Sequence, residues 1–176
     1  MIISKTPYRI SFFGGGTDYP SWFKSNKGKV LSATIDKFVY LSLRKLPPYF
    51  DYKHRIVWSK VENVKNIKMI QHRVVREMLN FYKINYRTEI HYQGDIPART
   101  GMGSSSSFVV GLMNLLLCQE NIKTSKIELA KKCIYFEQKI LNEVVGIQDQ
   151  ISASLGGFNK ISIQENGIFK IKKIKI

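Results

Sequence analysis

The segment from Pro97 to Ser107, Pro-Ala-Arg-Thr-Gly-Met-Gly-Ser-Ser-Ser-Ser, combines two glycines with four consecutive serines. Gly101 and Gly103 remove side chains where a ligand would approach the backbone closely, and the serines follow where a helix is expected to begin. A helix start offers unpaired N–H groups and the positive end of the helix dipole, which together attract anions. A serine hydroxyl there can cap the helix or complete the ligand shell of Mg²⁺. The segment is therefore a candidate phosphate-binding loop.

Two widespread phosphate loops do not fit this segment. A Walker A loop requires Lys and then Ser or Thr after its last glycine, whereas Ser104 directly follows Gly103 here. A Rossmann fingerprint requires a third glycine three residues after the second, where this chain has Ser106. The structural alternative is a flexible serine-rich loop that caps an ordinary helix. The glycines and serines alone do not separate that alternative from a binding loop.

Two further segments carry residue types that suit phosphoryl transfer. The opening Thr-Pro-Tyr-Arg-Ile-Ser-Phe-Phe-Gly-Gly-Gly-Thr-Asp-Tyr holds Arg9 and Asp18 around a triple-glycine turn, and Gly-Ile-Gln-Asp-Gln holds Asp149. Phosphoryl transfer needs cations, a metal ion and a group that orients the attacking hydroxyl. Taken locally, Asp149 could instead cap a helix and Asp18 could simply follow the turn. Arg9 could be an ordinary arginine at the end of a strand.

Together the three segments, in this order, resemble the motifs of the GHMP kinase superfamily, named for galactokinase, homoserine kinase, mevalonate kinase and phosphomevalonate kinase. Residues 97–107 resemble its ATP loop, Pro-x-x-x-Gly-(Leu/Met)-Gly-Ser-Ser, and residues 6–19 resemble its first motif. Residues 146–150 resemble the segment that holds its catalytic aspartate. Within the superfamily the chain most resembles the bacterial D-glycero-D-manno-heptose 7-phosphate kinase group, which shares the Gly-Gly-Gly-Thr-Asp opening, the run of four serines and the Gln-Asp-Gln triplet.

The resemblance implies an α+β fold of the ribosomal protein S5 domain 2-like type, a mixed sheet with helices packed on one face. Strands early in the chain and helices later are also typical of α+β proteins. Residues 1–176 would form the N-terminal, ATP-binding domain of such a kinase. Nothing after Ile163 resembles the family's glycine-rich third motif, so the C-terminal domain is expected to be absent.

The resemblance also implies roles for single residues. Asp149 would act as the general base, or orient the attacking hydroxyl, and Arg9 would keep this carboxylate ionised and stabilise the transferring phosphoryl group. Ser105 would be the serine ligand of Mg²⁺, with Ser104 as the next choice, and Glu137 would be the acidic ligand. The residues expected to bind ATP are Pro97, Arg99, Thr100, Gly101, Met102, Gly103, Ser104, Ser105, Ser106 and Ser107. The residues expected to contact the sugar are Arg9, Gly14, Gly15, Thr17, Asp18 and Asp149.

The expected activity is ATP- and Mg²⁺-dependent phosphorylation of a hydroxyl on a sugar or sugar phosphate, with heptose 7-phosphate as the first candidate. One alternative is a non-catalytic remnant that binds nucleotide or sugar without turnover, because the second domain is expected to be missing. A nucleic-acid-binding module is less favoured. The formal net charge of +15 would permit it, but the basic residues are spread over the whole chain and no RNA-binding motif is present.

The elements that must position these residues follow from hydrophobic periodicity. Alternating patterns predict strands over residues 2–13, 29–45, 54–58 and 86–92. Helical spacing predicts helices over residues 68–82, 104–120, 125–141 and 148–154. Asn166-Gly167 between two alternating runs predicts a final β-hairpin.

Composition sets the class of protein. With 176 residues, 44% of them hydrophobic, the chain can bury the core of one compact domain. We expect no signal peptide and no partner membrane, because no segment approaches the roughly 20 apolar residues of a membrane span. Cys118 and Cys133 have no metal-ligand spacing and are interpreted as buried free thiols, which favours a reducing cytoplasm.

Overall fold

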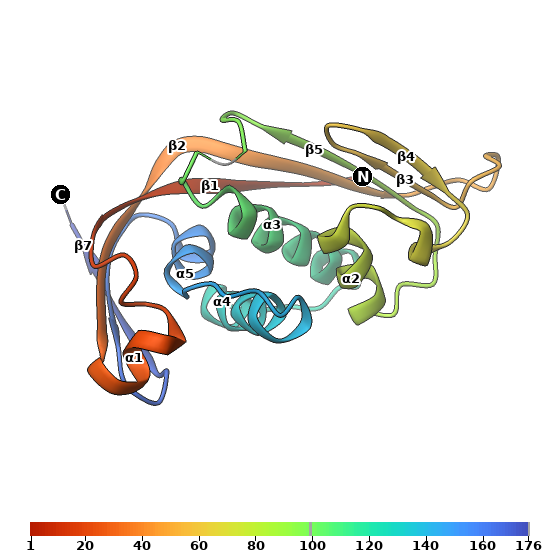
Figure 1. Cartoon of the computed structure of the whole chain (residues 1–176). Helices are drawn as coiled ribbons and strands as arrows, with labels where there is room; N and C mark the ends of the chain where they lie inside the picture. Colours follow the sequence, from red (N-terminus) through yellow and green to blue (C-terminus); the bar gives the residue numbers. More distant parts are fainter. Residues whose placement is uncertain (99, 176) are drawn as a thin grey trace.

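A mixed β-sheet runs the length of the molecule (Figure 1). The computed structural model describes residues 1–98 and 100–175, and within them seven strands form one sheet. The strands are β1 (Ile2–Phe13), β2 (Gly28–Lys45), β3 (His54–Val57), β4 (Val61–Val64), β5 (Thr88–Gly94), β6 (Phe158–Ile163) and β7 (Phe169–Ile174). The long strand β2 joins the sheet together, because it pairs antiparallel with β1, with β5 through its second half and with β6 through its first half. The pairing of β3 with β5 is parallel, which makes the sheet mixed.

The main helices lie together on one face of this sheet (Figure 1). They are α2 (Arg73–Phe81), α3 (Ser104–Gln119), α4 (Lys126–Tyr135) and α5 (Gln148–Leu155), and a short helix α1 (Pro20–Asn26) follows the triple-glycine turn. Helix α3 packs against β1, β2, α4 and α5, and nearly all of it is buried. It carries no charged residue, which is the composition of a helix surrounded by core. The predicted α+β fold with helices on one face of a mixed sheet is confirmed.

Most predicted elements are present, and α1 and β4 were not predicted. The helix expected over residues 68–82 begins later, since only a 3₁₀ turn (η1, Ile67–Met69) precedes α2. The Glu62 carboxylate accepts the backbone N–H groups of Gln71 and His72 at 2.5 and 3.1 Å, which holds this stretch extended. Helix α2 then begins with the His72 side chain as its cap, accepting the N–H of Val75. A contact with Glu62, nine and ten residues earlier in the chain, therefore overrides the local helical period.

The two cysteines differ in burial. Cys133 is buried on α4, as expected, but Cys118 is exposed, so the prediction of two buried thiols is wrong for Cys118. Cys118 lies four residues after Asn114, which is also exposed, so both side chains lie on the outward face of α3, whereas Leu116 and Leu117 in the same turn are buried. Among the described residues, no helix is both long enough and apolar enough to cross a membrane.

Candidate active site

Arg9 and Asp149 form a two-point ion pair between the sheet and α5. Arg9 lies on β1, and its Nε and Nη2 atoms each donate to one carboxylate oxygen of Asp149 at 2.7 Å. The two side chains are 11% and 23% exposed, so the pair is largely shielded from water. Helix α5 begins at Gln148 with Ile147 in the N-cap position, so Asp149 is not the cap of this helix. The Asp149 carboxylate therefore pairs with Arg9 and does not cap helix α5.

Arg9 also contacts the predicted phosphate loop. Its Nη1 donates to the carbonyl oxygen of Gly101 at 2.7 Å, and its backbone N–H donates to the carbonyl oxygen of Met102 at 3.1 Å. A Cβ placed on Gly103 would lie 3.3 Å from both Arg9 Cγ and Asp149 Oδ2. The glycine thus lets the loop approach the ion pair, and the loop and Asp149 lie on the same side of the molecule.

The start of α3 keeps its backbone donors available. Gly103 occupies the N-cap position with a left-handed φ of 75°, and no described side chain caps the helix there. Ser104 and Ser105 follow in the first turn, where the N–H groups of a helix have no partner within the helix. The predicted helix start with free donors is thus present beside Arg9 and Asp149. Such an arrangement can bind a phosphate group.

Glu137 is a carboxylate with no exposed surface. Both of its oxygens accept the Ser106 hydroxyl, at 3.0 and 3.1 Å, and one also accepts the Gln150 side-chain amide. Burial raises the pKa of Glu137 to about 7, the hydrogen bonds from Gln150 and Ser106 oppose this rise, and the charges of Glu143 and Asp149 add to it. Glu137 therefore changes its protonation state near neutral pH, unlike an ordinary surface glutamate.

A π-helical turn brings Glu137 into this position. The helix expected over residues 125–141 is α-helical only as α4, and residues Phe136–Ile140 (η2) continue it with π geometry. There Leu141 N–H donates to the carbonyl of Phe136, five residues back. Such wider turns are rare and are often found at functional sites.

Burial raises the pKa of Asp149 above the ordinary value of an aspartate, and the charge and hydrogen bonds of Arg9 oppose that rise. The nearby Asp18 carboxylate adds a smaller effect in the same direction as burial. An aspartate with a raised pKa is a stronger base, whereas the pairing with Arg9 favours its ionised form. Asp149 thus combines the two properties that a group receiving a proton requires.

Asp18 is almost completely buried, with 1% exposure. Its two oxygens accept the backbone N–H groups of Gly16 at 3.2 Å and of Gln148 at 3.0 Å. It therefore joins the triple-glycine turn to the start of α5. Thr17 lies in the same turn, and its hydroxyl donates to the carbonyl oxygen of Gly14 at 2.7 Å.

A small cavity of about 140 Å³ brings most of these side chains together. Its lining includes Arg9, Asp18, Ser106, Glu137 and Asp149. Small-molecule sites usually enclose roughly 300–1,000 Å³. The cavity therefore has room for reacting groups, and the remainder of a nucleotide or sugar would lie outside it.

The predicted loop residues differ in burial and in their contacts. Ser105 and Ser106 line the cavity, and Ser105 is exposed whereas Ser106 is the serine in contact with Glu137. Thr100 and Gly101 are exposed in the loop before α3, where the Thr100 hydroxyl donates to the carbonyl of Pro97 at 3.3 Å. The prediction for Arg99 lies outside the described residues. Ser107 is buried and donates to the carbonyl of Pro7, which fixes α3 to β1.

The two glutamines beside Asp149 have contacts that the sequence did not indicate. Gln150 is fully buried and donates its side-chain amide to Glu137, and Gln148 supplies the backbone N–H that holds Asp18. The Gln-Asp-Gln triplet was visible as a motif. It carried no information about these contacts, because the partners lie outside the motif, 13 residues from Gln150 and 130 residues from Gln148.

Comparison with known proteins identifies the class that this fold and site define. The family of GHMP kinases, N terminal domain, matches residues 67–157, just over half of the chain. The chain belongs to this family.

One curated relative aligns with nearly the whole of this chain. The curated D-glycero-alpha-D-manno-heptose 7-phosphate kinase of Campylobacter jejuni subsp. jejuni serotype O:2 is 28% identical over 187 residues, covering 99% of this chain and 54% of that protein. This chain thus spans about half the length of that relative.

Two solved structures share the fold. A D-glycero-D-manno-heptose 1-phosphate kinase from Bacteriodes thetaiotaomicron superposes with a TM-score of 0.86 at 22% identity, over all of this chain and 60% of that one. A putative sugar kinase from Campylobacter jejuni gives a TM-score of 0.75 at 25% identity, over 99% of this chain and 58% of that one. Because the identity to the Bacteriodes thetaiotaomicron kinase is only 22%, that comparison shows a shared fold and nothing more.

Proposed function

We propose that this chain provides the ATP site and the proton acceptor of a kinase that phosphorylates a hydroxyl of a sugar or sugar phosphate. One observation carries the proposal: Arg9 contacts both the loop before α3 and the carboxylate of Asp149. The group that would stabilise a transferring phosphate and the group that would accept a proton are therefore held side by side. Phosphoryl transfer requires this combination of positioning and charge.

The nucleotide triphosphate would bind at the start of α3. The free N–H groups after Gly103 and the positive helix end favour an anion there. The Arg9 guanidinium lies directly beside this loop and adds a permanent positive charge. These features support binding of the phosphates of ATP, while the base and ribose would extend beyond the small cavity.

The residues present also fit Mg²⁺. Glu137 offers a buried carboxylate that changes protonation near pH 7, and the exposed Ser105 hydroxyl lines the same cavity. Among the described residues no group of three or more His, Cys, Asp or Glu side chains could hold a metal ion. Mg²⁺ commonly takes only one or two protein carboxylates and completes its shell with water and phosphate oxygens. Bound there, it would neutralise charge on the phosphates, and Ser106 would fix the orientation of Glu137.

The acceptor hydroxyl would be oriented by Asp149. The raised pKa of Asp149 makes the carboxylate a better proton acceptor, and Arg9 fixes its position through two hydrogen bonds. Asp18, which lines the same cavity, is the second carboxylate that could accept a hydrogen bond from a sugar hydroxyl. Heptose 7-phosphate is the substrate that we propose to test first, because the curated relative is a heptose 7-phosphate kinase.

A phosphoryl-transfer assay tests this proposal. The chain is incubated with ATP, Mg²⁺ and D-glycero-D-manno-heptose 7-phosphate, and ³¹P NMR detects ADP and a sugar bisphosphate. We expect product from the parent and a loss of roughly 10²–10⁴-fold in Asp149→Asn, because the proton acceptor is removed. Asp36→Asn, which changes an exposed aspartate on β2, is the matched control and should retain the parent rate. Product formation by Asp149→Asn at the parent rate, or no ATP-dependent product from the parent, would contradict the proposal.

A further inference from the structure

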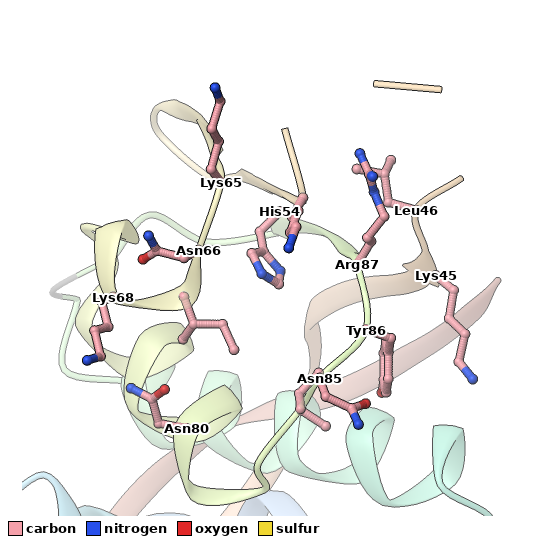
Figure 2. Close-up of a pocket in the computed structure, with 13 residues that line it drawn as sticks. Lys45, Leu46, His54, Lys65, Asn66, Lys68, Asn80, Asn85, Tyr86 and Arg87 are labelled. Atoms are coloured by element: carbon pink, nitrogen blue, oxygen red, sulfur yellow. The ribbon is translucent and has the colours of Figure 1, made fainter. Parts of the chain in front are cut away.

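A second and larger cavity, of about 800 Å³, lies outside the candidate active site. Figure 2 shows it between the start of β3, the η1 turn, the end of α2 and the segment that leads into β5. Its volume falls within the range of small-molecule sites, roughly 300–1,000 Å³. Its size therefore suits a small ligand better than an extended polymer.

Every described lining residue that carries a permanent charge at neutral pH is basic. These residues are Lys45, Lys53, Lys65, Lys68 and Arg87, and the described lining contains no aspartate or glutamate. Asn66, Asn80 and Asn85 add side-chain amides that can donate hydrogen bonds. In Figure 2 the side chains of Lys45, Lys65 and Lys68 extend outward from the edge of the cavity. Positive charges that surround a concave surface still make the electric potential inside it positive, so this cavity attracts anions.

Two of the lining groups are held in place by the fold. The Arg87 guanidinium donates to the carbonyl oxygens of Phe50 and, at 2.7 Å, Tyr52, while its Nε is buried with no partner among the described residues. His54 is 5% exposed, and its Nδ1 lies 2.8 Å from the Thr88 hydroxyl. A guanidinium fixed in advance loses less entropy when it binds an anion than a free side chain does.

His54 also responds to the surrounding charge. Burial, followed by the positive charges of Lys53 and Arg87, lowers the pKa of this histidine. In Figure 2 its ring lies between Asn66 on one side of the cavity and Arg87 on the other. An anion that entered the cavity would therefore change the environment of the ring, which makes His54 a reporter of binding.

The cavity and the phosphate loop lie at opposite ends of β5. Thr88, at the first end, contacts His54 in the cavity, whereas Gly94, at the other end, leads towards the loop that begins at Pro97. A strand of seven residues spans about 20 Å at roughly 3.3 Å per residue. One phosphate group cannot occupy both places.

We propose that this cavity is a second anion site, which binds a small ligand carrying one or more phosphate groups. Phosphate suits it because several charges can be matched at once, and because arginine and amide groups bind phosphate oxygens through directed hydrogen bonds. The site does not depend on the function proposed for the loop and Asp149.

Ring resonances of the three histidines test the proposal directly. Inorganic tripolyphosphate is added without Mg²⁺, and ¹H–¹³C spectra follow His54 in the cavity, His72 beside the start of α3 and His91 on β5. The His54→Gln variant assigns the reporting signal. We expect the His54 signals to shift along a saturating one-to-one curve, while sodium chloride of equal ionic strength has no such effect. Unshifted His54 signals, or a shift that salt reproduces, would overturn the proposal.

Charge-reversal variants separate a built site from general attraction to a basic protein. Lys45→Glu/Lys68→Glu removes two lining charges, and Lys170→Glu/Lys172→Glu makes the same change in net charge on exposed residues of β7. The first variant should weaken the His54 response roughly tenfold, because two attractions become repulsions, and the second should leave it nearly unchanged. Equal weakening by both variants would overturn the proposal.

A check of folding and a titration with a second ligand complete the experiment. Each variant must keep the parent His91 signals as a check of folding, and the corresponding lysine-to-glutamine pairs replace any reversal that perturbs them. Glucose 6-phosphate, titrated in parallel, distinguishes a site for a sugar phosphate from a site for a polyphosphate chain. A saturable response to either compound supports the second site, and the absence of any response contradicts it.

Discussion

Asp149 and Glu137, two of the acidic side chains in the small cavity, have different partners that offset the cost of burying a negative charge. Asp149 has a guanidinium at two points of contact, whereas Glu137 has only a hydroxyl and an amide. A neutral donor offsets less of the cost of burying a charge than a cation does, so the pKa of Glu137 rises to about 7. A metal ion that replaced the proton on Glu137 would restore the missing positive charge.

The pKa of Glu137 predicts how stability depends on pH. Between its ordinary pKa of 4.5 and its folded pKa of about 7, the unfolded chain has lost the proton that the folded chain retains. Stability that is present below pH 4.5 is therefore lost as the pH rises through 7, by roughly 3 kcal/mol. Urea denaturation without Mg²⁺ measures this effect in Glu137→Gln. The free energy of unfolding of the variant minus that of the parent should increase by roughly 3 kcal/mol from pH 4 to pH 8.

A control separates this effect from the loss of any carboxylate. Glu165→Gln removes an exposed glutamate from the loop before β7, and its difference from the parent should stay nearly constant over the same pH range. A pH-independent difference for Glu137→Gln would mean that the buried carboxyl does not titrate as described.

At the scale of elements, the site depends on where β1, α3 and α5 begin and end. Most strands and helices followed from periodicity, although α1 and β4 did not, and the loop motif correctly placed the start of α3 after Gly103. The π turn that directs Glu137 inward could not be predicted, because a single turn of five residues is too short for its hydrophobic spacing to be distinguished from that of an α-helix. The contact between Ser106 and Glu137 could not be predicted either, because it depends on how α3 packs beside that turn.

Two glycines in the loop allow a matched test of this geometry. Gly101 and Gly103 have φ values of 74° and 75°, but a Cβ would crowd Arg9 and Asp149 only at Gly103. Each substitution by alanine should cost about 1–2 kcal/mol of stability, because both backbones are left-handed. Gly103→Ala should in addition lower the phosphoryl-transfer rate well below that of Gly101→Ala. Equal rates in the two variants would show that close approach at residue 103 is not required.

The molecule as a whole places two anion-attracting regions at the two ends of one strand. The first combines a helix start, Arg9 and three carboxylates, those of Asp18, Glu137 and Asp149, and the motifs in the sequence pointed to it. The second was not predicted, because its lysines come from separate segments and none of them belongs to a motif. The net charge of +15 gave no indication that five of its positive charges line one cavity.

Calorimetric titration of the chain with Mg²⁺ and ATP tests the central claim most directly, since that claim is that the start of α3 and Glu137 form one nucleotide site. We predict binding of one ATP per chain, weakened about tenfold in Ser105→Ala through loss of a metal ligand, and unchanged in the control Ser162→Ala on β6. Failure of the parent to bind ATP, or equal affinities of Ser105→Ala and Ser162→Ala, would contradict this account.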